Sequence, residues 1–261
     1  MKVLVLAHGI LGFGAPKFLL LGKLINKFRY FSGVSAAINQ KVLKVLEPHV
    51  PTIGSVQMRA DRLAELILKN TLPDDEIYIV AHSMGGLDAR LALHQNPTLS
   101  ARVAVLTTIG TPHDGSPVAD ADVAAGGTYM TEKILNFLPS RAQGLLDLTT
   151  AACAAFNRDC PDATGITYYA IAGDALAGNK FSAMLKFASQ IGGIENVPND
   201  GVVVVESAER KNWFILPRWP VDHLALIGWH TDYLFNSNEH IERYLQLISH
   251  ITGIDYQQLK K

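Results

Sequence analysis

The sequence predicts an α/β domain built around a mostly parallel, doubly wound sheet. Short, almost continuous apolar runs alternate along the chain with segments of helical periodicity. Strands that are apolar throughout, without a polar alternate face, are typical of parallel sheets covered by helices on both sides. The 261 residues contain 48% hydrophobic and 18% charged residues, with no repeat or linker-like run. We therefore expect a single domain over residues 1–261.

Each expected element follows from its local pattern. The strands are aliphatic or β-branched and are bounded by turn residues, and they cover residues 2–7, 76–81, 103–109, 167–172 and 201–206. Helical periodicity lies between them and at the C-terminus, at residues 59–70, 85–95 and 239–252. Two apolar segments, 15–28 and 121–148, fall outside this alternation. They are either core-covering helices or a helical cap over an apolar cleft.

Composition limits the possible partners and compartments. The formal net charge of −1 gives no whole-chain attraction to nucleic acid. The chain also has no run of 18 apolar residues, which a membrane-spanning helix would need. No leader precedes the first strand, so we expect a cytoplasmic protein, or a secreted one whose leader was removed. Cys153 and Cys160 would lie about 10 Å apart along a helix, too far for a disulfide, and are expected to be free thiols.

The most informative segment is 77–87, IYIVAHSMGGL, in which a strand leads through a serine into a helix. It matches the G-x-S-x-G nucleophile elbow with Ala81 in place of the first glycine. Small residues are needed because the serine occupies a strained turn where strand and helix approach closely. The alternative is a serine that merely caps the helix. The order of strand, serine and helix favours Ser83 as a nucleophile.

A second turn, His8-Gly9, follows the first strand and leads into Ile10. Alone, a His-Gly pair indicates only a turn. Together with the elbow, it predicts that the Ile10 and Met84 amides form the oxyanion hole.

The catalytic base should follow the acid in the chain, because the order on this fold is Ser, Asp or Glu, then His. His223 lies in a loop before an apolar segment and is our first choice, with His230 as the alternative. His240 and His250 belong to the terminal helix.

Two residues compete for the acid. Asp200 lies in the turn Asn199-Asp200-Gly201, and Asp174 follows the preceding strand. Spacing alone favours Asp200 without excluding Asp174. Asp222 is adjacent to His223, and neighbours in sequence rarely orient each other's rings.

Four segments together resemble a known family: 7–13 (AHGILGF), 81–86 (AHSMGG), 107–116 (TTIGTPHDGS) and 199–201 (NDG). They are similar to bacterial family I triacylglycerol lipases of the Pseudomonas and Burkholderia type. The resemblance implies an α/β-hydrolase fold, Ser83 as nucleophile, Asp200 as acid and His223 as base. It also implies the Ile10 and Met84 amides as the oxyanion hole.

The chain departs from those lipases around the base. Where the secreted members have an aspartate that binds a structural calcium, this chain has Ala225. Where they have a glutamine, it has Trp229, and no cysteine lies between Asp200 and His223. The cap segment is shorter than in those lipases, and residues 15–28 are longer and more apolar. We therefore expect no metal and no cofactor.

The sequence thus predicts a serine carboxylic-ester hydrolase that forms an acyl-enzyme on lipid-like or polyester substrates, with a lipid–water interface among its candidate partners. An acyltransferase using the same residues and a non-catalytic lipid-binding pseudoenzyme are the alternatives. If the two apolar segments form a cap, the expected substrate-binding residues are Leu11, Phe18, Leu21, Ile134 and Leu138.

Overall fold

The expected apolar runs form the central sheet of the protein, whose computed structural model describes residues 1–10, 30–126, 143–178, 181–229 and 239–261. Within these residues the sheet has six strands, all parallel, in the order β2-β1-β3-β4-β5-β6. The strands are β1 (Lys2–Ala7), β2 (Lys44–Leu46), β3 (Glu76–His82), β4 (Val103–Ile109), β5 (Thr167–Ile171) and β6 (Phe214–Ile215).

Each central strand sends alternate side chains to two separate cores, because side chains of a strand point to opposite faces. Leu4 and Leu6 pack into the core on one face, and Val5 and Ala7 pack into the core on the other. Both sets are apolar since both faces are covered. This explains why the sequence of β1 has no polar alternation.

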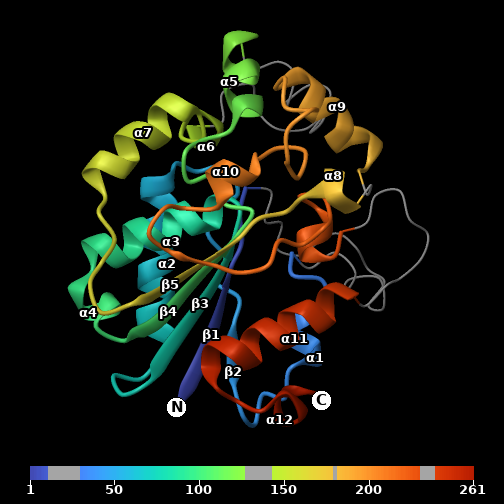
Figure 1. Ribbon diagram of the computed structural model, residues 1–261. Helices are drawn as coiled ribbons and strands as arrows, with labels where there is room; N and C mark the ends of the chain where they lie inside the picture. Colours follow the sequence, from blue (N-terminus) through green and yellow to red (C-terminus); the bar gives the residue numbers. More distant parts are fainter. Residues whose placement is uncertain (11–29, 127–142, 179–180, 230–238) are drawn as a thin grey trace, which may run out of the picture.

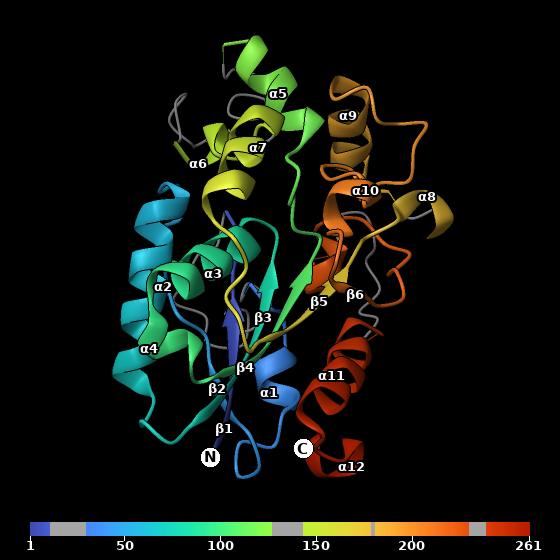
Figure 2. The same cartoon turned by 60° about the vertical axis from the view of Figure 1, so that its left-hand side comes forward.

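Helices from distant parts of the chain cover the two faces (Figure 1; Figure 2). On one face lie α2 (Val56–Asn70), α3 (Met84–Gln95) and α4 (Pro97–Ser100). On the other lie α1 (Val34–Ala37), α11 (Glu239–Thr252) and α12 (Tyr256–Leu259). The bounds of α11 agree with the range predicted from its periodicity. α2 begins three residues earlier than expected, at Val56, directly after its N-cap Ser55.

A further group of helices lies beyond the carboxyl ends of the strands, at the top of Figure 1. It comprises α5 (Pro117–Ala124), α6 (Gln143–Leu146), α7 (Thr150–Asp159), α8 (Ala175–Gly178), α9 (Ala183–Ile191) and α10 (Val205–Ala208). Ser116, Thr149 and Ser182 cap α5, α7 and α9 by accepting amide hydrogen bonds. None of the helices in the described ranges combines the length and apolar character that a membrane crossing needs.

One strand prediction was wrong. Residues 201–206 form a turn that continues into α10, although four consecutive valines favour a strand. The Asp200 carboxylate accepts hydrogen bonds from the Val202 and Val203 amides, at 3.0 and 2.8 Å, and thereby bends the chain. Val203 and Val205 are instead buried in a small apolar cluster. Local side-chain hydrogen bonds outweigh the β-propensity here.

The two cysteines are free, as predicted, and both are buried. Cys153 lies within α7 and Cys160 directly follows it. Of the two expected cap segments, 15–28 lies outside the described residues, and 121–148 is described only at its ends.

Candidate active site

Ser83 occupies a strained turn between β3 and α3. Its backbone has φ 56° and ψ −135°, a conformation that costs about 1–3 kcal/mol for a residue with a side chain. Two hydrogen bonds hold it there: the Ser83 amide donates to the Ile109 carbonyl at 3.0 Å, and the Thr111 hydroxyl donates to the Ser83 carbonyl at 2.8 Å. This is the turn that the elbow motif predicts.

Glycines around Ser83 are required by close contacts. A Cβ atom on Gly85 would lie 2.6 Å from the Ala7 carbonyl oxygen, and one on Gly9 would lie 2.7 Å from the Ser83 Cβ. One on Gly86 would lie 2.2 Å from the Thr111 hydroxyl oxygen. The small residues of the two motifs therefore let β1, β3 and α3 meet at Ser83.

His223 reaches Ser83 from the loop before a short 3-10 helix, η3 (Ala225–Ile227). Its Nε2 lies 2.9 Å from Ser83 Oγ, and its Nδ1 lies 2.6 Å from Asp200 Oδ2. The His223 amide also donates to the Asp200 carbonyl at 2.8 Å. The structure thus brings the three residues together in one hydrogen-bonded chain.

Asp200 and its competitor Asp174 have different surroundings. Asp200 is buried, and its carboxylate accepts hydrogen bonds on both oxygens, from two backbone amides and from His223. The Asp174 carboxylate accepts from the Ala177 amide and lies 3.8 Å from Arg218. Asp174 therefore caps the start of α8, and it is Asp200 that accepts the hydrogen bond from His223 Nδ1.

Asp222 has a role that the sequence did not reveal. Its two carboxylate oxygens accept from the Ala225 amide at 2.9 Å and the Ser182 amide at 2.8 Å. It thereby joins the loop of His223 to the start of α9. Burial is the main cause that raises the pKa of Asp222. Sequence showed only an aspartate beside the histidine, with no sign that it is buried.

The residues expected to form the oxyanion hole lie beside Ser83 in the chain and across from it after β1. β1 and β3 are parallel neighbours with Ala7 opposite Ala81, so Gly9 and Ile10 continue past β1 beside Ser83 and Met84. Met84 is the first residue of α3, whose N-terminal amides favour negative charge. The Ile10 side chain packs against the cluster that contains Met84.

A buried ion pair supports the turn after β1. Arg59 of α2 donates to the His8 carbonyl at 2.7 Å and contacts Asp88 of α3 at 2.8 Å. Both side chains are buried, and burial raises the pKa of Asp88 to about 7. Sequence reasoning missed this pair, because a polar residue on a buried helix face resembles one on an exposed face. The one available signal was Arg59 in register with the apolar positions of α2.

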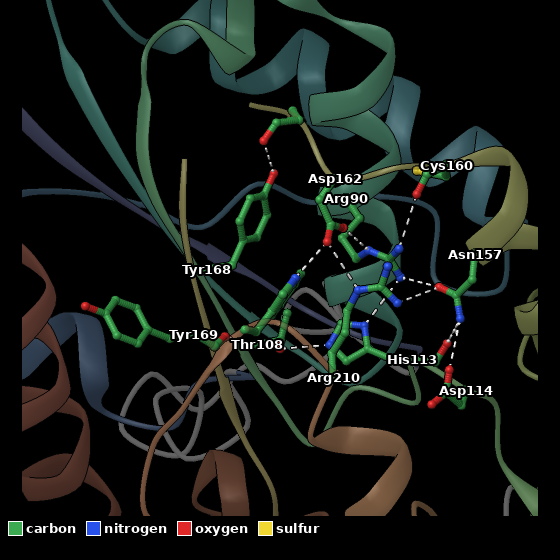
Figure 3. Close-up of polar contacts among 12 residues, drawn as sticks. Arg90, Thr108, His113, Asp114, Asn157, Cys160, Asp162, Tyr168, Tyr169 and Arg210 are labelled. Atoms are coloured by element: carbon green, nitrogen blue, oxygen red, sulfur yellow. Dashed lines mark hydrogen bonds and ion pairs between the residues drawn. The ribbon is translucent and has the colours of Figure 1, made fainter. Parts of the chain in front are cut away.

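The segment after β4 anchors a second polar network (Figure 3). Its His113 is completely buried and contacts the Thr108 hydroxyl at 3.0 Å. Asn157 of α7 donates to the His113 carbonyl, and its side-chain oxygen accepts from Arg90 and Arg210. Burial holds the pKa of His113 well below its ordinary value. His113 thus joins α3 to α7, through Arg90 and Asn157.

Several predicted site residues lie outside the described part of the chain: Leu11, Phe18, Leu21, Ile134, Leu138 and the alternative base His230. Of the other histidines, His240 is buried and its Nε2 lies 2.6 Å from the Ser32 carbonyl oxygen. Within the described ranges there is no cluster of three His, Cys, Asp or Glu residues suited to a metal ion.

Comparisons with known proteins agree with this architecture. Residues 38–160 match a family model described as a PGAP1-like alpha/beta domain, which is somewhat less than half of the chain. Triacylglycerol lipase 2 of Saccharomyces cerevisiae is 27% identical over 215 residues, which cover 78% of this chain and 63% of the yeast protein. The chain therefore spans less than two thirds of that relative.

A second relative, a triacylglycerol lipase of Vibrio cholerae, is 26% identical over 234 residues, covering 77% of this chain and 71% of its own. Among solved structures, the mature lipase of Bacillus licheniformis superposes with a TM-score of 0.68 at 19% identity. That match covers 94% of this chain and 91% of the lipase. The parallel sheet with helices on both faces is the α/β-hydrolase fold.

Proposed function

We propose that this protein is a serine carboxylic-ester hydrolase in which Ser83 is the nucleophile, His223 the base and Asp200 the acid. One observation carries the proposal: a serine in a strained strand-to-helix turn is hydrogen-bonded to a histidine, which is hydrogen-bonded to a buried aspartate. The relatives and the solved neighbour, which are named lipases, support the same class of reaction.

The reaction follows from this chain of contacts. Ser83 Oγ adds to the ester carbonyl carbon while its proton passes to His223 Nε2. The negative oxygen that results is stabilised by the Ile10 and Met84 amides. The intermediate then collapses, and the leaving alcohol takes the proton from His223. Water releases the acyl group from Ser83 by the same two steps, and the serine hydroxyl is restored.

The proposed substrates are esters of lipid or polyester character. The two relatives support this class, since both are named triacylglycerol lipases. The apolar side chains next to Ser83 support it as well: Ile10, Met84 and Leu87 belong to one cluster at this end of the sheet. Action at a lipid–water interface, and the finer assignment to the Pseudomonas and Burkholderia type, belong to the same proposal.

The test is a series of p-nitrophenyl esters of increasing acyl length, with an emulsified triglyceride beside it. We expect turnover of at least part of the series, and a Ser83→Ala variant that is folded and inactive. Retention of more than about a hundredth of the rate would contradict the proposal, because loss of a nucleophile costs far more than this. Ester products formed in the presence of added alcohols, exceeding hydrolysis, would indicate an acyltransferase.

A further inference from the structure

His82, the residue before Ser83, contacts the backbone of the proposed base. Its Nε2 lies 3.1 Å from the His223 carbonyl oxygen, and its Nδ1 lies 2.8 Å from the Tyr30 hydroxyl. All three residues are buried. The His82 and His223 rings also lie close together, tilted by 46° with centroids 4.6 Å apart. The reaction proposed above uses neither His82 nor Tyr30.

The direction of these hydrogen bonds is determined by their chemistry. A carbonyl oxygen only accepts, so His82 Nε2 must carry a hydrogen and donate it to His223. A neutral imidazole has a single N–H, so Nδ1 accepts from the Tyr30 hydroxyl. Burial holds the pKa of His82 well below its ordinary value and raises the pKa of Tyr30, so the ring stays neutral and the phenol keeps its proton. Tyr30 therefore fixes the tautomer that lets His82 donate.

This donation completes the attachment of the His223 backbone. On one side, the His223 amide donates to the Asp200 carbonyl at 2.8 Å. On the other side, the His223 carbonyl accepts from His82. Both peptide groups that flank the His223 Cα are thus held. Since His223 lies in a loop, these two attachments fix the backbone that carries the imidazole, while the Asp200 carboxylate holds the ring itself at Nδ1.

Tyr30 is itself held close to the turn after β1. A Cβ atom on Gly9 would lie 2.7 Å from the Tyr30 hydroxyl oxygen, so the phenol packs directly against the backbone of that turn. The Tyr30 ring also contacts Trp229, at 5.8 Å between centroids, beyond η3. Tyr30 thus lies between the turn that leads to Ile10 and the loop that carries His223.

We propose that Tyr30 and His82 are positioning residues: Tyr30 sets the tautomer of His82, and His82 holds the His223 carbonyl so that the imidazole stays directed at Ser83. This inference rests on the proposed function. It predicts an effect on the chemical step with little effect on substrate binding, because neither side chain needs to touch the substrate.

The test compares the kcat and KM of four variants on one soluble p-nitrophenyl ester. His82→Leu removes the donor, and Tyr30→Phe removes the hydroxyl that fixes the tautomer. Each should lower kcat about three- to tenfold, the range of one hydrogen bond, with KM within about twofold. His82→Gln offers an N–H near the position of Nε2 and should recover most of the lost kcat. The double variant should be no slower than His82→Leu, because both changes break the same connection.

Tyr244→Phe is the matched control. Its hydroxyl is buried and has no hydrogen-bond partner among the described residues, so the same chemical change should leave kcat unaltered. Unchanged kcat in Tyr30→Phe and His82→Leu, or additive losses in the double variant, would overturn the inference. A His82→Gln variant with a kcat as low as that of His82→Leu would also overturn the inference. If His82→Leu does not fold, Tyr30→Phe and His82→Gln decide the question. Absence of esterase activity in the wild type would instead refute the proposed function.

Discussion

At the residue scale, Asp200 is distinguished from Asp174 by what its two oxygens contact. In the sequence, Asp174 follows a strand and Asp200 lies in a later turn, and spacing favoured Asp200 without excluding Asp174. In the structure, Asp200 Oδ2 faces His223 Nδ1 while Oδ1 is occupied by two backbone amides. Because the two amides hold Oδ1, the carboxylate cannot rotate, and Oδ2 keeps the imidazole in one orientation.

Asp200→Asn should therefore be severe and Asp174→Asn mild. An asparagine at 200 can turn its amide nitrogen toward His223 Nδ1 and stabilise the wrong tautomer, as in serine proteases, with a loss of kcat on the order of a thousandfold or more. At 174 an asparagine still caps α8, and activity should stay within about threefold. Steady-state kinetics of both variants measure the difference. The reverse order of losses would move the acid to Asp174.

At the scale of elements, the long strands were predictable and the short ones were not. β1, β3, β4 and β5 are five to seven residues long and consist mostly of apolar residues. β2 and β6 have only three and two residues, and those of β6 are exposed, so they leave no pattern of burial in the sequence. In the site, too, only part was predictable. A sequence motif identified Ser83, whereas Arg59, Asp88 and Asp222 hold the site together as buried residues, and their burial cannot be seen in the sequence.

The loop of His223 illustrates how one buried carboxylate supports an element. Asp222 joins η3 to the start of α9 through two backbone amides. In the secreted lipases that the sequence resembles, a calcium ion secures this loop. Here the family's ligand position is Ala225, which has no side-chain oxygen. We infer that Asp222 provides the attachment through protein hydrogen bonds.

Activity and melting temperature should accordingly be independent of calcium. Calcium needs about six to eight oxygen ligands, normally including carboxylates. Both properties should be unchanged in excess EGTA and after calcium is added back. Asp222→Asn, which has one acceptor oxygen where two are used, should lower the melting temperature in either condition. A loss in EGTA that calcium reverses would show that an ion secures the loop.

At the scale of the whole molecule, buried histidines make stability depend on pH. Burial, and then the charge of Arg59, lower the pKa of His8 to about 4 from its ordinary value of 6.5. The unfolded chain therefore takes up a proton below pH 6.5, while the folded chain does so only near pH 4. The stability that His8 contributes is present above pH 6.5 and is lost as pH falls toward 4.

A His8→Gln variant should remove this dependence. Between pH 7 and 5 the free energy of unfolding of the wild type should fall by about 2 kcal/mol more than that of the variant. The comparison with a variant is needed because burial raises the pKa values of Asp88 and Asp222, which act in the opposite direction. Urea unfolding at the two pH values measures the difference. Equal losses in both proteins would show that His8 does not titrate in this way.

The proposed chemistry depends on one atom, Ser83 Oγ, activated only in the folded molecule. A fluorophosphonate probe followed by peptide mass spectrometry tests this directly, because the reagent bonds covalently to a serine that an adjacent base has activated. We expect one adduct per chain, on Ser83, in the native wild type, and none in heat-unfolded protein or in Ser83→Ala. An adduct on another residue, equal labelling of the unfolded chain, or no labelling of active native protein would contradict the assignment.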